Sequence, residues 1–107
     1  MLKNRKVVWA KTAIRDLDKI IGFIHQIRPA TAKKVLLAIK RKAKTLKMHA
    51  KKGRLLPELS HIPEISFREI VIAPWRLVYR IKDNIEVLAL LDSRRDLDEI
   101  IFERLMR

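Results

Sequence analysis

Apolar and polar side chains alternate along residues 75–81, "WRLVYRI", with the period typical of a β-strand. Successive side chains of a strand point to opposite faces of its sheet. The apolar side chains on one face are Trp75, Leu77, Tyr79 and Ile81. The side chains on the opposite face include Arg76, Val78 and Arg80. We therefore expect one face to pack into a core and the other to present a row of cations.

Two segments in the N-terminal half repeat apolar residues every three or four positions, the spacing of an amphipathic helix. The first begins near Thr12, a residue type suited to the N-cap. Its predicted buried stripe is Ile14, Leu17, Ile20, Ile21, Ile24 and Ile27. The second opens at Pro29, because proline is tolerated in the first turn of a helix. Its predicted stripe is Ala32, Val35, Leu36, Ile39, Ala43 and Leu46. The short connection at Pro29 predicts a helical hairpin.

The other segments predict strands, one loop and a final helix. We expect a short strand at 5–10, a loop at 48–63, strands at 64–73, 75–81 and 85–91, and a helix over 95–107. Short connections between the last three strands favour an antiparallel meander. The predicted order is β-α-α-β-β-β-α, an α+β fold in which the helical hairpin packs on a mostly antiparallel four-stranded sheet. The length of 107 residues predicts a single domain over residues 1–107.

The charge of the chain is strongly positive and unevenly distributed. Its 25 Lys and Arg residues face 12 Asp and Glu residues, which gives a net charge of +13. No carboxylate occurs between Asp18 and Glu58, an interval that holds twelve cations. Such a field attracts nucleic acid, an acidic protein or anionic lipid, and the composition does not distinguish them.

Cysteine usage and hydropathy bear on the compartment. The chain has no cysteine, which excludes disulfides and thiolate metal sites. Neither a signal peptide nor a transmembrane span is apparent in the sequence. We expect a cytoplasmic protein without a membrane partner, a metal or a cofactor.

Four short motifs follow a strand and a helix pair in a fixed order. They are "GRLLPEL" (53–59), "FREIVI" (67–72), "WRLVYRI" (75–81) and "SRRDLDEII" (93–101). On these motifs the chain resembles the ParE/RelE toxin superfamily of bacterial type II toxin–antitoxin systems over essentially its whole length. The resemblance implies one of two activities. RelE-like members are ribosome-dependent mRNA endoribonucleases, and ParE-like members are non-nucleolytic inhibitors of DNA gyrase.

The residues needed for proton transfer distinguish these two branches. In the ribonuclease branch, the resemblance implies two lysines on the strand before "WRLVYRI", arginines on and after that strand, and a tyrosine or a His–Tyr pair near the C-terminus. Arg76 matches the strand arginine, and Arg94 or Arg95 matches the later one. Phe67 and Glu69 occupy the lysine positions, and the residues in place of the tyrosine are Ile100, Ile101 and Phe102. Arginine stays protonated at neutral pH and is a poor general base.

The motifs "FRE" and "GRLLPEL" resemble the ParE branch instead. We therefore predict a non-enzymatic, ParE-like inhibitor of DNA gyrase that is neutralised by a ParD-like antitoxin with an acidic binding segment. The alternative is a RelE-like endoribonuclease in which His49 or His61 supplies the missing base. A third possibility is a plain nucleic-acid-binding module, so DNA and the ribosome remain alternative partners.

Six arginines are predicted to bind partners: Arg54, Arg68, Arg76, Arg80, Arg94 and Arg95. Structural roles compete with partner binding at several of these positions. Arg54 is spaced to form a local ion pair with Glu58, which is our preferred role for it. Arg76 and Arg80 have carboxylates such as Glu69 on the neighbouring strand. For Arg80 the structural role is favoured, and for Arg76 both roles remain open.

Overall fold

The fold is described from a computed structural model over residues 5–59, 61–62, 66–95 and 97–105. The helices are α1 (Lys11–Ile27), α2 (Pro29–Lys44) and α3 (Asp98–Leu105). The strands are β1 (Val7–Trp9), β2 (Arg54–Leu55), β3 (Phe67–Ile72), β4 (Trp75–Ile81) and β5 (Ile85–Asp92). Short 3₁₀ helices follow α2 and flank β2, namely η1 (Thr45–Lys47), η2 (Ala50–Lys52) and η3 (Pro57–Leu59). The predicted α+β class is confirmed. None of the helices in these ranges is long and apolar enough to cross a membrane.

The sheet has the strand order β1-β5-β4-β3-β2. β1 pairs with β5 in parallel, and the other neighbours are antiparallel. The prediction of four strands was wrong by one, because β2 pairs Arg54 with Glu69 and Leu55 with Arg68 at the edge next to β3. Two residues are too few to show an alternating pattern, so β2 cannot be predicted from its own sequence and is defined only by its pairing with β3.

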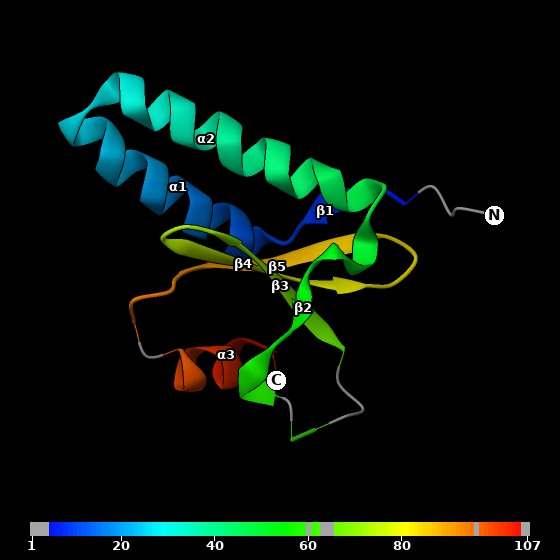
Figure 1. Cartoon of the computed structure of the whole chain (residues 1–107). Coiled ribbons are helices and arrows are strands. Elements are labelled where there is room, and N and C mark those ends of the chain that lie inside the picture. Colours follow the sequence, from blue (N-terminus) through cyan, green and yellow to red (C-terminus); the bar gives the residue numbers. More distant parts are fainter. Residues whose placement is uncertain (1–4, 60, 63–65, 96, 106–107) are drawn as a thin grey trace.

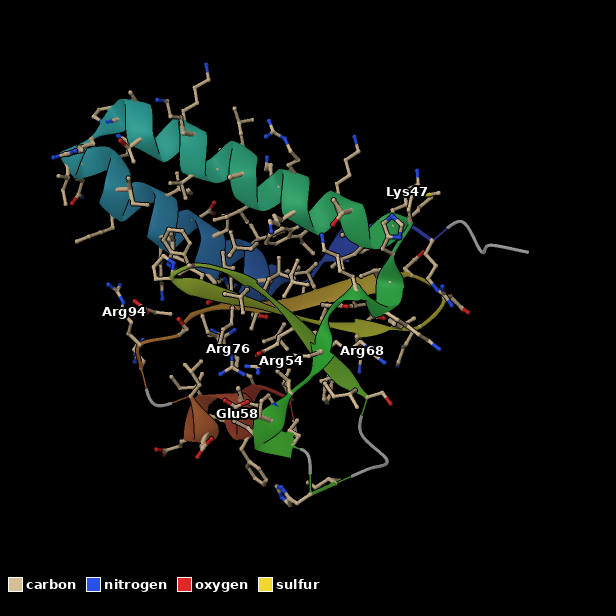
Figure 2. All side chains as sticks on the ribbon, viewed as in Figure 1. Lys47, Arg54, Glu58, Arg68, Arg76 and Arg94 are labelled. Carbon is tan, nitrogen blue, oxygen red and sulfur yellow. The ribbon has the colours of Figure 1, made fainter. Side chains whose placement is uncertain are left out.

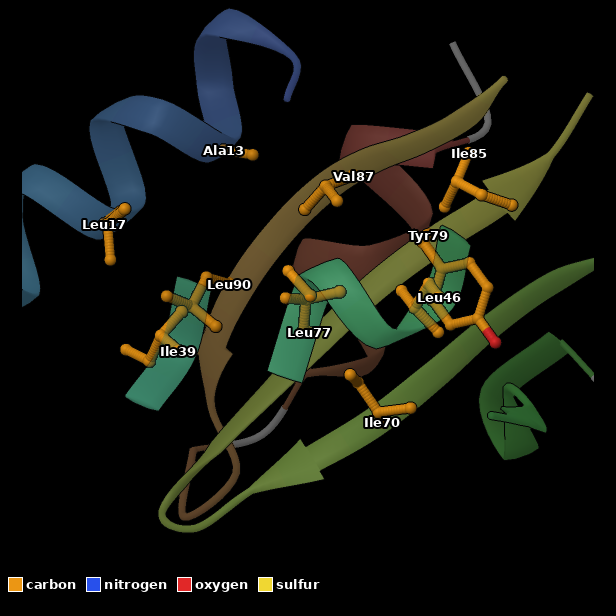
Figure 3. Close-up of a cluster of buried hydrophobic side chains, with 11 residues drawn as sticks. Ala13, Leu17, Ile39, Leu46, Ile70, Leu77, Tyr79, Ile85, Val87 and Leu90 are labelled. Atoms are coloured by element: carbon orange, nitrogen blue, oxygen red, sulfur yellow. The ribbon is translucent and has the colours of Figure 1, made fainter. Parts of the chain in front are cut away.

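One face of the sheet is covered by the helical hairpin of α1 and α2 (Figure 1). The predicted alternation along β4 places Leu77 and Tyr79 in this core, where both are fully buried. Figure 3 shows them together with Leu17 of α1 and Ile39 of α2. The predicted stripe of α2 is confirmed in its centre, since Ala32, Ile39 and Ala43 are buried and Val35 and Leu36 pack partly buried against the same core. Leu46, the last residue of the predicted stripe, is buried as well but lies in η1.

The prediction for α1 was partly wrong. The helix begins at Lys11, so Thr12 lies inside the first turn and is not its N-cap. The Thr12 hydroxyl instead donates a hydrogen bond of 3.2 Å to the carbonyl of Leu88. Ile14 and Ile27 are 45% and 64% exposed, whereas Ala13 is fully buried. The close approach of α1 to the sheet therefore centres on a small residue, and the apolar positions extend over more than one face.

The opposite face of the sheet is covered in part by α3 and η3 (Figure 1). The buried side chains of this second cluster are Leu56, Leu59, Val78, Ala89, Leu91, Leu97 and Ile101. Val78 is fully buried there, although it shares a strand face with Arg76 and Arg80. The expectation of a plain row of cations on this face was therefore incomplete, because the face carries a core of its own.

The segment before β2 is fixed by Tyr79. The Tyr79 hydroxyl donates to the carbonyl of Ala50 at 2.7 Å and accepts from the backbone N–H of Gly53 at 2.9 Å. Burial raises the pKa of Tyr79. A Cβ atom at Gly53 would lie 2.5 Å from the carbonyl oxygen of Glu69 and 2.6 Å from the Tyr79 hydroxyl. Only glycine fits at this position without a shift of β3 or of Tyr79.

Candidate partner-binding site

A buried ion network lies between the sheet and η3. The Glu69 carboxylate has no exposed surface and accepts from Arg54 Nε at 2.6 Å and from Arg76. Arg76 also forms a bidentate pair with Glu58, with nitrogen–oxygen distances of 2.6 and 2.7 Å. Figure 2 shows Arg54, Glu58 and Arg76 on the same side of the sheet. Among the residues that the structure describes, the network has two guanidinium and two carboxylate groups, so their formal charges cancel.

The expected local pair between Arg54 and Glu58 was wrong in its partners. Arg54 pairs with Glu69 across the β2–β3 ladder, and Glu58 pairs with Arg76 of β4. The bidentate bond with Arg76 lowers the pKa of Glu58, and the same bond raises the pKa of Arg76. The Arg76 residue is 8% exposed. It therefore has little surface to offer a partner.

Arg68 and Arg80 also have structural contacts. Arg68 Nη1 donates to the carbonyl of Gly53 at 2.7 Å and so helps to fix the segment that Tyr79 clamps. Arg80 pairs with Glu86 of β5 at 2.7 Å, and both side chains are about one-third exposed. The preferred structural partner for Arg80 is thus a carboxylate of β5 instead of Glu69.

A groove of about 680 Å³ lies between α1, the ends of β4 and β5, and α3. Its apolar lining comprises Ile20, Phe23, Ile24, Trp75, Leu90, Leu91 and Ile100. Its cationic lining comprises Lys19, Arg94, Arg95 and Arg104. Phe23 is 67% exposed, although the chain has few aromatic residues with which to build its cores. The groove therefore combines uncovered apolar surface with a positive rim.

The turn after β5 positions two of the rim arginines. Ser93 donates from its backbone N–H and its hydroxyl to the carbonyl of Pro74, at 2.8 and 2.7 Å. Asp92 accepts from the backbone N–H of Arg94 at 2.9 Å and from its guanidinium at 2.6 Å. These bonds lower the pKa of Asp92 to about 2. Arg94 stays 73% exposed in its side chain despite this pairing, and Arg95 beside it is exposed as well.

Asp16 and Arg104 are site residues that sequence reasoning missed. The Asp16 carboxylate accepts two bonds from Arg104 of α3, at 2.8 and 3.0 Å, and one from the backbone N–H of Leu90 at 3.0 Å. One side chain of α1 thus fixes both β5 and α3 at the edge of the groove. No spacing in the sequence pointed to this pair, because Asp16 and Arg104 are 88 positions apart on two different helices.

The six predicted arginines do not converge on one place. Arg94 and Arg95 line the groove, whereas Arg54, Arg68, Arg76 and Arg80 lie along β2, β3 and β4. The histidines of the ribonuclease alternative line other depressions. His49 lies with Lys51 and Lys52, and His61 lies with acidic residues of α3. Neither lines the groove that holds Arg94 and Arg95.

Comparison with known families decides the relationship. The sequence profile of the family described as "ParE toxin of type II toxin-antitoxin system, parDE" matches residues 7–97. The chain belongs to the ParE toxin family. The match extends from β1 to the residue before α3, and it includes both arginines of the β5–α3 turn. The predicted resemblance to the ParE branch is confirmed.

A solved structure supports the fold of this ParE family member. It is described as "Chromosomal ParDE TA system from P. aeruginosa" and superposes with a TM-score of 0.69 at 24% sequence identity. The match covers 84% of this chain and 97% of that chain. No curated protein matches the sequence.

Proposed function

We propose that this ParE family toxin inhibits DNA gyrase by binding it, without cleaving nucleic acid, and that an acidic antitoxin segment neutralises it. The observation that carries the antitoxin part is the groove between α1 and α3, in which exposed Phe23 lies beside the cationic rim. Membership in the ParE family supports the proposal that gyrase is the target.

The groove suits a segment that is apolar on one side and acidic on the other. The exposed apolar lining offers anchor sites, which usually supply most of the affinity of such an interface. The lining holds the four cations named above against two carboxylates, and this excess of positive charge orients an acidic segment and accelerates its association. The carboxylates in the groove, Asp16 and Asp92, are already bound to Arg104 and Arg94. They therefore oppose an acidic partner less than free carboxylates would.

The ion network argues against the ribonuclease activity. Stabilising the transition state of RNA cleavage requires an uncompensated cation near the phosphate. Arg76, the residue that matches the strand arginine of the ribonuclease branch, is held by Glu58 and Glu69. Glu69 itself stands where that branch has a lysine. A phosphate would therefore meet a neutral network in which two carboxylates already occupy the guanidinium.

Gyrase inhibition is tested with purified toxin, gyrase and relaxed plasmid. We expect loss of supercoiling or accumulation of cleaved DNA trapped on gyrase. A parallel reaction with ribosomes and mRNA is expected to leave the message intact. Cuts at codon positions in that reaction, together with unaffected gyrase, would overturn the proposal and support the endoribonuclease alternative.

Antitoxin binding in the groove is tested with Phe23→Ser and a matched control. Phe102 of α3 is also an exposed aromatic, at 59%, and lines a different depression. We expect Phe23→Ser to weaken binding of the cognate antitoxin by tenfold or more, and Phe102→Ser to leave it nearly unchanged. Calorimetric titration measures both. Equal affinities for the two variants would show that the antitoxin does not bind in this groove, and would not affect the proposal that the toxin inhibits gyrase.

A further inference from the structure

We propose that the outer face of α2 binds the backbone of duplex DNA. This proposal goes beyond the proposed function and does not depend on it. The cations of α2 are Lys33, Lys34, Lys40, Arg41, Lys42 and Lys44, and all six are exposed. The helix contains no carboxylate, even in its first turn, where negative charge would favour the helix dipole. Solubility alone does not explain this exclusion, because acidic residues promote solubility better than basic ones.

The charges of the molecule are unevenly distributed between its two sides. The ion pairs described above neutralise arginines of the sheet, the β5–α3 turn and α3, and none of them involves a cation of α2. Acidic side chains gather on the other side of the sheet, where Glu58, Asp98, Glu99 and Glu103 line one shallow groove. α2 and α3 lie on opposite faces of the sheet (Figure 1). A polyanion is therefore directed to the α2 side.

The positive surface continues past the end of α2. Lys47, which lies at that end in Figure 2, lines a cleft of about 590 Å³ together with Arg5, Lys51 and Lys52. Lys52 Nζ donates to the Thr45 hydroxyl at 3.3 Å, which holds one ammonium group beside the helix end. The face thus extends from α2 through η1 and η2 without an intervening acidic residue.

The shape and chemistry of this face favour a duplex over a single strand. No Phe, Tyr or Trp occurs between Phe23 and Phe67, and α2 contains no histidine, so the helix has no ring on which unpaired bases could stack. His49 lies beyond the helix, in the adjoining cleft. Lysine predominates over arginine, which suits point contacts with phosphates more than bidentate reading of bases. The face is therefore suited to sequence-independent binding of the phosphate backbone.

Helix geometry favours DNA over RNA. At 100° per residue, Lys33, Lys40 and Lys44 form one ridge of α2, and Lys34 and Arg41 form a second. A helix with its side chains is about 10–12 Å wide, and the major groove of B-DNA is about 12 Å wide. The buried face of α2 lies opposite Lys34 and Arg41, so this ridge points outward, with the Lys33, Lys40 and Lys44 ridge on one flank and Lys42 on the other. The two flanks can then face the phosphates on both edges of that groove. The major groove of duplex RNA is too narrow and deep to admit such a helix.

The test compares two neutralised pairs with the same spacing on different helices. Lys40→Gln/Lys44→Gln removes two charges from the α2 face. Lys11→Gln/Arg15→Gln removes two exposed charges from α1. Fluorescence anisotropy with a labelled DNA duplex, over a series of salt concentrations, gives the dependence of log K on log salt for each protein. Circular dichroism confirms that both variants remain folded.

Each lost phosphate contact reduces the magnitude of the salt slope by about 0.9. For Lys40→Gln/Lys44→Gln we expect the magnitude of the salt slope to fall by about 1.8 and the affinity for the duplex to fall more than tenfold at about 0.1 M salt. For Lys11→Gln/Arg15→Gln we expect little change in either quantity. Equal slopes for both variants would show that the net charge acts without a defined face, and would overturn the proposal. Tighter binding to single-stranded DNA or to duplex RNA than to duplex DNA would also overturn it. The assay contains neither gyrase nor antitoxin, so its failure and that of the proposed function are distinguishable.

Discussion

Replacing Arg76 by methionine removes the cation that holds two carboxylates, while the side chain keeps a similar length. Glu69, with no exposed side-chain surface, would then keep a single ion pair, with Arg54. Glu58 would lose its bidentate partner, although its 16% exposed side chain can turn towards water. The main cost is therefore the incomplete compensation of the buried Glu69 carboxylate.

The magnitude follows from that burial. Breaking a buried ion pair by removing one partner costs about 3–5 kcal/mol. We expect the lower end of this range, about 3 kcal/mol, because Arg54 remains. For a domain of this size such a loss lowers Tm by roughly 10–20 °C. It is also a large share of the total stability of a typical domain, about 5–15 kcal/mol.

Chemical denaturation followed by circular dichroism measures the loss. Arg80→Met is the matched control, because Arg80 lies on the same strand face and its pair with Glu86 is partly exposed. We expect this control to lose less than about 1 kcal/mol. Arg76→Met/Glu69→Met removes the buried carboxylate as well, and we expect it to be more stable than Arg76→Met alone.

Two results would refute this reasoning. One is a loss below about 1 kcal/mol for Arg76→Met, which would mean that the network contributes no more than a surface pair. The other is a double variant that is less stable than Arg76→Met, which would mean that Glu69 is favourably placed without its partner.

Two further predictions concern Gly53 and Glu58. Gly53→Ala should lower the free energy of unfolding by about 1–3 kcal/mol, because its Cβ would overlap the Glu69 carbonyl and Tyr79. Gly22→Ala, in open space on α1, should raise the free energy of unfolding by about 0.5–1 kcal/mol. Urea titration measures both variants, and a change of the same sign in the two would contradict the packing argument. The pKa of Glu58 is lowered from 4.5 by Arg76, so its ionised form stabilises the fold above about pH 4.5, and this contribution is lost as the pH falls through the lowered value. Glu58→Gln should thus be less stable than the parent protein at pH 7 and approach it towards pH 3, whereas a constant difference over this range would count against the pairing.

The parts of the fold that repeat in sequence were predictable. The alternation along β4 and the stripe of α2 both correspond to buried faces, because each depends only on the period of one element. β2 was missed because the two residues Arg54 and Leu55 have no period. The stripe of α1 was drawn too wide, because an apolar side chain such as Ile27 remains exposed beyond the contact with the sheet.

The ion pairs of the site could not be predicted, because spacing along the sequence does not say which of several carboxylates an arginine will contact. Glu58, four positions away, was expected to be the partner of Arg54, but strand pairing brings Glu69 closer from fifteen positions away. The groove required three segments to meet, and Asp16 and Arg104 are 88 positions apart. Arg94 and Arg95 were singled out because two adjacent arginines after a buried strand exceed what a structural role needs. Both line the groove, and their contact with a partner stays a prediction.

The parallel pairing of β1 with β5 has a consequence for synthesis on the ribosome. Val7 lies opposite Ile85, so the first strand has no partner until β5 has been made. The α1–α2 hairpin consists of local contacts and can form much earlier. A nascent chain that stops before β5 therefore leaves β1 unpaired and one edge of β4 open. It also lacks the turn after β5 that positions Arg94. A chain that stops there is thus without the groove between α1 and α3.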